Sequence, residues 1–330
     1  PIPLHPAQQR LWFLDRLEGP SAAYNIPALL EIRGPLDAAL LARCLEQLVA
    51  RHESLRTGIE ATDGEPRQRI DPPYALDPGV TAVADEDTAR QQAEDLARTP
   101  FDLGVGRLFR ARLLQLAAAR YWLVLVVHHS AVDGSALGVL VEELAALYEA
   151  GLAGKPDPLP TPALQYADMA VWERQYLSSA RLTRQLAYWR ETLHGVDTLL
   201  ELPTDRPRPA VQESHGATLG FSLSAALSRD IQRFARDHGL TPFLVLLGAF
   251  AVLLHRLGQR EDFLIGTPVA SRRQRQTEGL VGYLANTLAL RLDLAGNPDT
   301  HALLARLRRT TLGAYAHQDL PFERLVEALQ

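Results

Sequence analysis

The segment YWLVLVVHHSAVDG, residues 121–134, constrains the fold of this chain more than any other stretch. Its first half, residues 121–127, is largely apolar and has the length and composition of a buried strand. The strand leads into a loop that carries two histidines and an aspartate. Residues 135–150 then carry apolar side chains at the spacing of an amphipathic helix. A rigid strand and a rigid helix are therefore expected to hold a loop of titratable groups between them.

The N-terminal half of the chain alternates patterns typical of helices and strands. We expect helices at residues 7–17, 36–50 and 85–98, and strands at residues 28–33, 108–116 and 121–127. The turn Asp63-Gly64 separates two short β-like runs, which predicts a hairpin. The last two strands are expected to pair across a short connection. This half is therefore predicted to form an antiparallel sheet flanked by helices.

A proline-rich stretch gives the best internal boundary. Residues 151–162, GLAGKPDPLPTP, contain four prolines in twelve residues and break the regular pattern. We therefore expect an N-terminal lobe over residues 1–162, and a connecting helix followed by a partial C-terminal lobe over residues 163–330. The second lobe is expected to contain helices at 163–194, 225–238, 242–257, 301–316 and 322–329, and strands at 217–223, 262–267 and 287–292. Because a helical pattern is still running at Gln330, we expect this lobe to be truncated.

The composition excludes several classes of function. The 330 residues include 34 basic and 39 acidic side chains, and the net charge of −5 argues against a broad nucleic-acid interface. The single cysteine, Cys44, allows neither an internal disulfide nor a multi-cysteine metal site. We find no secretory signal and no apolar run of about 18 residues, so we expect a cytoplasmic protein without a membrane segment. A Walker-type phosphate loop and a Gly-x-Ser-x-Gly elbow are also absent, which leaves nucleotide hydrolysis and serine hydrolase chemistry without support.

The loop after residue 127 offers one candidate for proton transfer. His129 lies four residues before a carboxylate, and histidine is the usual proton acceptor near neutral pH. The simpler alternative is that both histidines merely end the strand and that Asp133 caps the following helix. Ser130 has no other feature of an activated nucleophile. From the residues alone, both interpretations of the His-Asp pair stay open.

The segment HHSAVDG, residues 128–134, resembles the HHxxxDG signature of condensation domains from nonribosomal peptide synthetases. The other motifs of that family are matched in order along the whole chain: AQQRLWFL (7–14), RHESLRT (51–57), YADMAVW (166–172), IGTPVASR with GLVGYLANTLALR (265–272 and 279–291) and HQDLPFERLVE (317–327). One such motif alone would be weak evidence, but six in order are specific.

The resemblance implies both a fold and a reaction. The fold is α+β, with two lobes similar to chloramphenicol acetyltransferase in a V-shaped pseudodimer, each a sheet flanked by helices. The reaction is the attack of a carrier-bound acceptor amine on a carrier-bound donor thioester, which forms an amide. The domain itself is expected to bind no cofactor and no metal. Its partners would be upstream donor and downstream acceptor peptidyl carrier proteins, whose phosphopantetheine arms hold the substrates, and a neighbouring adenylation domain.

The resemblance also implies roles for single residues. His129 corresponds to the catalytic histidine, which orients or deprotonates the amine or stabilises the tetrahedral species. His128 and Asp133 are implied to be structural, and Asp133 is expected to form a salt bridge with Arg272. Gly134 is expected to leave room for a pantetheine arm or for the amine.

Four further positions match the motifs with less specific roles. Arg51 and Arg56 are expected to form internal hydrogen bonds near the site. Trp172 is expected to pack between the lobes. Asn286 lies in a well-matched motif.

Some positions depart from the family pattern. The chain has Ser135 and Ala136 where the family usually has Trp-Ser, and His5 where it has serine. It also has Met169 where a tyrosine is common and Ser271 where a glycine precedes the arginine. None of these departures touches the expected catalytic pair.

Two other functions use a similar sequence. An epimerization domain shares the HHxxxDG signature, but the first, fourth and sixth motifs here resemble condensation. A noncatalytic recruitment module would dock a partner enzyme, and we would expect it to have lost the active-site pattern that this chain keeps. Heterocyclization domains replace the histidine doublet with an Asp-rich pattern that this segment lacks.

Overall fold

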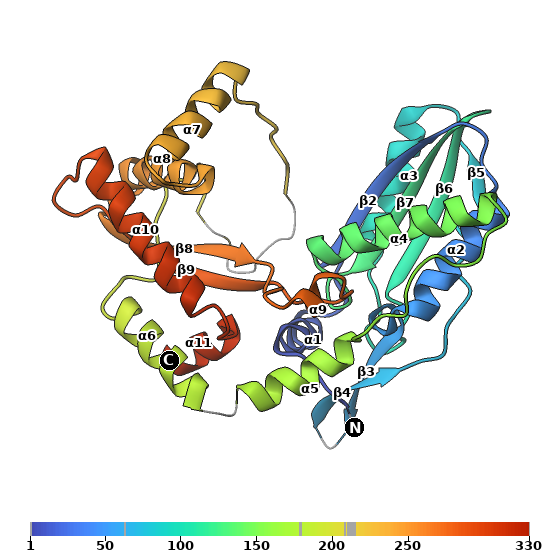
Figure 1. Ribbon diagram of the computed structural model, residues 1–330, viewed down its shortest axis with the longest axis horizontal. Helices are drawn as coiled ribbons and strands as arrows, with labels where there is room; N and C mark the ends of the chain where they lie inside the picture. Colours follow the sequence, from blue (N-terminus) through green and yellow to red (C-terminus); the bar gives the residue numbers. More distant parts are fainter. Residues whose placement is uncertain (1, 63, 178–179, 208, 210–215, 330) are drawn as a thin grey trace. The chain divides into compact units, whose positions relative to one another are not determined.

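The computed structural model describes residues 2–62, 64–177, 180–207, 209 and 216–329. The contacts between residues divide the chain into two compact units. Unit 1 comprises Pro1–Ser179 and Ala270–Ala285, and unit 2 comprises Ala180–Val269 and Asn286–Gln330. Each unit combines a sheet with helices (Figure 1), as expected for an α+β protein.

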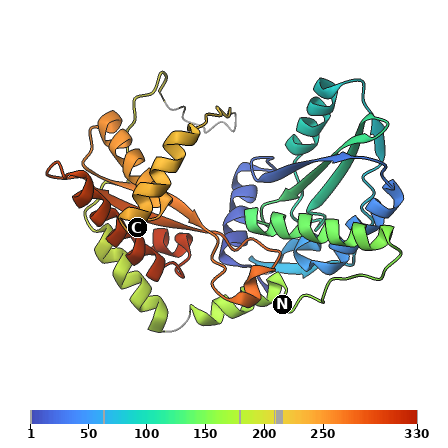
Figure 2. The ribbon, with the colours of Figure 1, turned by 45° about the horizontal axis from the view of Figure 1, so that its top comes forward.

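The sheet of unit 1 has four strands in the order β2-β7-β6-β5. Its strands are β2 (Asn25–Arg33), β7 (Arg120–His128), β6 (Phe109–Ala117) and β5 (Val80–Ala82). β7 pairs antiparallel with both β2 and β6, and every residue of β7 after Arg120 is buried. Helices cover both faces of the sheet (Figures 1 and 2), which explains why this strand is apolar without alternation. The predicted pairing of the two strands at 108–116 and 121–127 is confirmed.

Three long helices surround this sheet: α2 (Ala38–Arg51), α3 (Glu86–Arg98) and α4 (Gly134–Leu152). Each begins after an aspartate whose side chain accepts a backbone N–H of the first turn, as N-capping requires. The helices α2 and α4 lie on one side of the sheet and α3 on the other (Figure 1). The capping residues are Asp37, Asp85 and Asp133.

The remainder of unit 1 is a small sheet and the segments around it. The sheet has the order β1-β4-β3, and its β3-β4 pair is the hairpin predicted at Gly64. The elements are β1 (Ile2–Pro3), α1 (Pro6–Glu18), the 3-10 helix η1 (Glu53–Arg56), β3 (Thr57–Thr62), β4 (Glu65–Ile70), α5 (Tyr166–Tyr176) and α9 (Arg275–Glu278). Helix α5 contacts β1 and η1, so residues beyond the expected boundary at 162 belong to unit 1.

The described residues of unit 2 are built on the antiparallel pair of β8 and β9. Residue Asp262 of β8 lies opposite Asp293 of β9, and α10 packs against β9 and α8. Its elements are α6 (Ala180–Leu193), α7 (Ala225–Asp237), α8 (Pro242–Gly258), β8 (Asp262–Val269), β9 (Asn286–Asp293), α10 (Thr300–Ala316) and α11 (Phe322–Leu329).

Two expectations about secondary structure were wrong. The single helix predicted over 163–194 is two helices, because α5 ends at Tyr176 and α6 begins at Ala180. The strand predicted over 217–223 is irregular, and Leu219 and Phe221 are 92% and 86% exposed. An isolated strand cannot satisfy its backbone groups, and no strand among the described residues pairs with this segment.

Within the described chain, no single helix is long and apolar enough to cross a membrane. The helices α7 and α8 pass that test only as a pair, and they meet at a bend of 108°.

Candidate active site

His129 follows directly after β7 and is fixed at two points. Its backbone N–H donates to the carbonyl of Tyr24 at 2.8 Å, and its Nδ1 lies 2.8 Å from the carbonyl oxygen of Val132. A carbonyl can only accept, so Nδ1 carries the proton of the neutral ring. The lone pair is therefore on Nε2. The side chain is half-buried, and an unprotonated Nε2 can act as a proton acceptor.

His128 has the opposite environment. Its side chain is buried, and Nδ1 accepts the backbone N–H of Ser130 and lies 2.8 Å from the hydroxyl of that serine. Burial, together with the nearby His129, lowers the pKa of His128 to about 4. The ring is thus neutral near pH 7. Ser130 is fully buried and its hydroxyl is engaged with His128, so the structure gives no support to a nucleophilic serine.

Asp133 both caps α4 and pairs with Arg272, the role from the simpler alternative and the role implied by the resemblance. One carboxylate oxygen caps α4 by accepting the N–H of Ala136 at 2.9 Å. The other accepts from Arg272 Nη1 at 2.6 Å and from the backbone N–H groups of Leu284 and Ala285 at 3.0 and 3.2 Å. The Asp133 and Arg272 side chains are only 3% and 6% exposed. The expected salt bridge is therefore present as a buried pair with further hydrogen bonds.

Arg272 extends this pair to the turn at residues 280–285. Its Nη2 donates to the carbonyls of Leu280 and Gly282 at 3.1 and 3.3 Å. The residue before it, Ser271, has φ of 51°, a left-handed conformation that favours the glycine usual in the family. Asp133 and Arg272 together hold one turn of the chain in place.

Gly134 is the first residue of α4 and is exposed. A Cβ atom built at this position meets no described atom within 4 Å apart from its chain neighbours and the nearby backbone of α4. The space that a side chain would occupy at Gly134 is therefore open.

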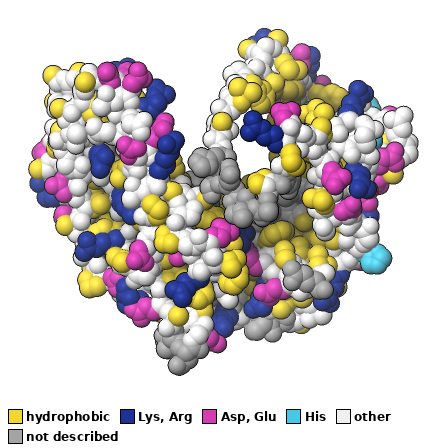
Figure 3. Space-filling view, turned by 180° about the vertical axis from the view of Figure 1, so that it is seen from behind, with side chains coloured by type: hydrophobic (Ala, Val, Ile, Leu, Met, Phe, Trp, Pro, Cys, Tyr) yellow, Lys and Arg dark blue, Asp and Glu magenta, His cyan; other side chains and the backbone are white. Residues whose placement is uncertain are grey.

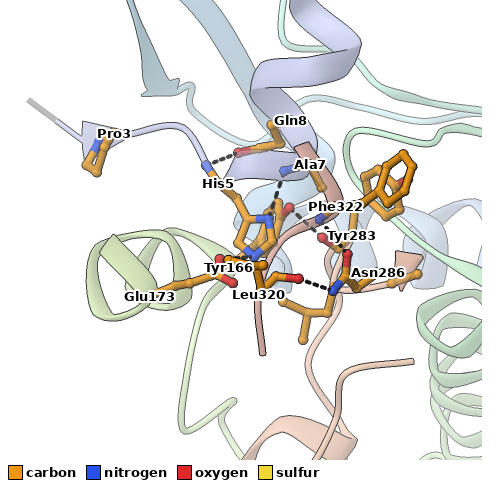
Figure 4. A network of polar contacts seen from close by, with 12 residues as sticks. Pro3, His5, Ala7, Gln8, Tyr166, Glu173, Tyr283, Asn286, Leu320 and Phe322 are labelled. Carbon is orange, nitrogen blue, oxygen red and sulfur yellow. Dashed lines mark hydrogen bonds and ion pairs between the residues drawn. The ribbon is translucent and has the colours of Figure 1, made fainter. Parts of the chain in front are cut away.

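The N-terminal helix also contacts the histidine loop. Gln8 Nε2 donates to the carbonyl of Ser130 at 3.3 Å, and its Oε1 accepts the N–H of His5 at 3.2 Å (Figure 4). His5, which replaces the family serine, caps α1 by accepting from Ala7 and lies 2.6 Å from Glu173. This cap holds the start of α1 beside the loop.

Arg51 and Arg56 make the internal hydrogen bonds that were expected, but their partners lie outside the histidine loop. Arg51 donates to Glu143 of α4 at 3.0 Å, and His52 lies 2.5 Å from the same carboxylate. Burial alone would raise the pKa of Glu143. The interactions with His52 and Arg51 outweigh burial, so the pKa is lowered. Arg56 donates to three backbone carbonyls, including that of Asp71 at 2.7 Å. Both arginines connect secondary-structure elements within unit 1.

Trp172 and Asn286 belong to different units. Trp172 lies on α5 in unit 1, is 41% exposed and stacks on Tyr176 with ring centroids 4.6 Å apart. Asn286 begins β9 in unit 2, where Nδ2 donates to the carbonyl of Leu320 at 2.7 Å and Oδ1 accepts the N–H of Phe322 at 3.0 Å (Figure 4). Asn286 therefore holds the HQDLPFERLVE segment onto the strand.

Tyr283, which contacts His129, and Arg10, which contacts Tyr283, were not singled out from the sequence. The ring of Tyr283 lies 4.2 Å from the imidazole, centroid to centroid, and Arg10 donates to the Tyr283 hydroxyl at 2.8 Å. Both lie inside matched motifs, but 273 positions separate them, and no local spacing indicates that they meet.

Charged side chains of both signs lie on the surface (Figure 3). Cationic and anionic side chains are interspersed over the face drawn in Figure 3. Within the part of the chain that the structure describes, no three histidine, cysteine or carboxylate side chains are grouped so that they could hold a metal ion.

Comparison with known proteins places this geometry among relatives. The family model described as the condensation domain matches residues 1–330. One subunit of linear gramicidin synthase from Brevibacillus parabrevis is 44% identical over 340 residues, which cover 100% of this chain and 7% of that subunit. The chain spans only 4% and 6% of two further subunits of the same synthase.

Solved structures show the same fold. The X-domain from teicoplanin biosynthesis matches with a TM-score of 0.91 and 30% identity, over 99% of this chain and 73% of that one. The first condensation domain of the CDA synthetase matches with a TM-score of 0.84 and 25% identity, over 99% of this chain and 79% of that one. The predicted α+β class is therefore confirmed.

Proposed function

Because the chain belongs to the condensation-domain family of nonribosomal peptide synthetases, we propose that it forms an amide bond between two carrier-bound substrates. The acceptor amine attacks the thioester carbonyl of the donor. A C–N bond forms, the C–S bond breaks, and the amine proton ends on the departing thiolate. The reaction needs no redox step, and orientation of two tethered reactants can supply several kcal/mol of the barrier.

The tautomer of His129 is the observation that carries this proposal. With Nδ1 held by the Val132 carbonyl, Nε2 is the acceptor of the neutral ring, and the side chain is half-buried. An acceptor in that position can take the proton of the attacking amine or hold the amine by a hydrogen bond. His128 is not suited to this role because it is buried and its Nδ1 is occupied.

We infer that the substrates are supplied by partner proteins. In the proposed reaction an upstream donor and a downstream acceptor carrier protein present them on phosphopantetheine arms, and a neighbouring adenylation domain loads the carriers. The similarity to synthase subunits that are many times longer than this chain supports this arrangement.

A recruitment role is the second candidate. It is favoured by the similarity to the X-domain, which has been solved in a complex with OxyB. A docking module does not need an imidazole with an available Nε2, whereas this chain keeps both the HHSAVDG loop and the buried pair beneath it. Epimerization has no specific support beyond the shared signature. These features favour catalysis.

The test is single-turnover amide formation between a loaded donor carrier and a loaded acceptor carrier, in the intact protein that carries this chain. We expect His129→Ala to lower the rate constant by at least about 100-fold, the usual scale for removing an acid–base group. His301→Ala changes an exposed histidine of α10 and serves as the control, with a rate within about twofold of the wild type. If the wild type forms no amide but binds a partner enzyme, the recruitment role replaces catalysis.

A further inference from the structure

The face of the His129 ring is covered by Tyr283. The two ring centroids are 4.2 Å apart with an interplanar angle of 42°, and Tyr283 is only 6% exposed. Arg10 holds the other end of the tyrosine by donating to its hydroxyl at 2.8 Å. We propose that Tyr283 is a positioning residue that fixes the orientation of His129. This inference rests on the proposed amide-forming function.

The backbone of Tyr283 is held as firmly as its side chain. Its carbonyl accepts from the hydroxyl of Tyr166 at 2.7 Å. A Cβ atom on the preceding residue, Gly282, would lie 2.5 Å from the Tyr166 ring, so the turn is packed closely against α5. On the other side, the next two N–H groups of the turn donate to Asp133. The turn therefore cannot shift without breaking contacts on both sides.

The two restraints on His129 act on different parts of its ring. The Val132 carbonyl holds Nδ1 at the ring edge, whereas Tyr283 lies over the ring face. The edge contact alone leaves the ring free to tilt, and the face contact removes that freedom. Together they fix the direction of Nε2. A displacement of about 1 Å in a reacting group can cost roughly 100-fold in rate, so this restraint matters for the reaction.

The same contacts connect Asp133 to His129 through the turn at residues 280–285. Asp133 and Arg272 hold the turn at residues 280–285, and the turn carries Tyr283 to His129. Asp133 thus acts on His129 of the same motif through Tyr283. Its two partners in the turn, Leu284 and Ala285, follow it by 151 and 152 residues in the chain.

The decisive experiment measures Tyr283 variants with and without His129. In the wild-type background we expect Tyr283→Leu to lower the single-turnover rate constant at saturating substrate by at least about 30-fold. Tyr283→Phe keeps the ring and loses the hydrogen bond from Arg10, so we expect a loss of about 2- to 10-fold. In the His129→Ala background both changes should alter the rate by less than about twofold, because residues that act as a unit are not additive. Equal losses in the two backgrounds would overturn the proposal.

A second readout does not depend on activity. Diethyl pyrocarbonate acylates accessible neutral imidazoles, and peptide mass spectrometry gives the labelling rate of His129 relative to exposed His301. We expect that ratio to rise several-fold in Tyr283→Leu, because one face of the ring is uncovered. Tyr121→Phe, which removes the hydroxyl of another buried tyrosine in unit 1, should leave it unchanged. An unchanged ratio in Tyr283→Leu would refute the contact itself.

The two readouts separate the inference from the function on which it rests. If the wild type forms no amide while Tyr283→Leu still exposes His129 to labelling, the amide-forming function is wrong and Tyr283 positions nothing for that reaction. Thermal unfolding checks that each variant folds. Should Tyr283→Leu fail to fold, Tyr283→Met, which also lacks an aromatic face, takes its place in both experiments.

Discussion

Asp133→Asn removes the charge from a carboxylate that has four hydrogen-bond donors. Oδ1 accepts the N–H of Ala136 at the start of α4, and an asparagine oxygen can keep that cap. Oδ2 accepts from Arg272 and from the N–H groups of Leu284 and Ala285, and the amide NH₂ would face all three. The substitution thus places an amide donor opposite the three donors that Oδ2 accepts from.

The magnitude follows from burial. Arg272 is 6% exposed, so without Asp133 its charge stays in the interior without an ionic partner. Breaking a buried pair from one side costs about 3–5 kcal/mol, and we expect this loss in the free energy of unfolding. Arg272→Met leaves the carboxylate with three backbone donors at the N-terminus of α4, so we expect a smaller loss of about 2–3 kcal/mol.

Urea unfolding of the single variants and of the double variant gives these values. The double variant should lose clearly less than the sum of the singles, because the second change removes the unpaired charge left by the first. Asp230→Asn is the control: its pair with Arg233 is 57–66% exposed, and the loss should be about 0–1 kcal/mol. A loss below about 1 kcal/mol for Asp133→Asn, or a larger loss for Arg272→Met, would refute the reasoning.

Two further predictions concern stability. Ser271→Gly should raise the free energy of unfolding by about 0.5–1 kcal/mol, because a left-handed backbone strains serine. Asn297→Gly should raise it less, since asparagine tolerates its φ of 50°. Equal increases for the two variants in urea unfolding would contradict this. The pKa of His128 falls from 6.5 to about 4 on folding, so between those pH values only the unfolded chain binds this proton. The free energy of unfolding is therefore unaffected by this group above pH 6.5 and declines by up to about 3 kcal/mol toward pH 4. Urea unfolding at several pH values should show that decline, and His128→Gln should lack this part of it.

The elements that the sequence predicted correctly are those determined by their own pattern. The strand at 121–127 was recognisable because burial on both faces requires an unbroken apolar run. The helix after it was recognisable from its apolar spacing, and the capping aspartates mark helix starts in the sequence itself. The prediction of a strand at 217–223 was wrong because a strand also depends on a partner strand elsewhere in the chain. Alternation of apolar residues describes a strand that has a neighbour, and the pattern does not indicate whether a neighbour exists.

The candidate site was predictable where a motif names its residues and unpredictable where side chains meet across the chain. His129, Asp133 and Arg272 came from motifs of a known family, and the expected pair is present. The sequence did not indicate that Tyr283 covers His129, because that contact depends on how the turn at 280–285 folds back. Arg51 and Arg56 belong to an equally clear motif, yet their partners lie in other parts of unit 1.

The return of Ala270–Ala285 to unit 1 has a consequence for synthesis on the ribosome. The chain carries Asp133 out of the ribosome 139 residues before Arg272. At roughly 5–20 residues per second, that interval lasts about 7–28 s. Throughout it, the nascent chain holds the Asp133 carboxylate without Arg272 and His129 without Tyr283. The contacts of the site can therefore form only after β8 and residues 270–285 have been synthesised.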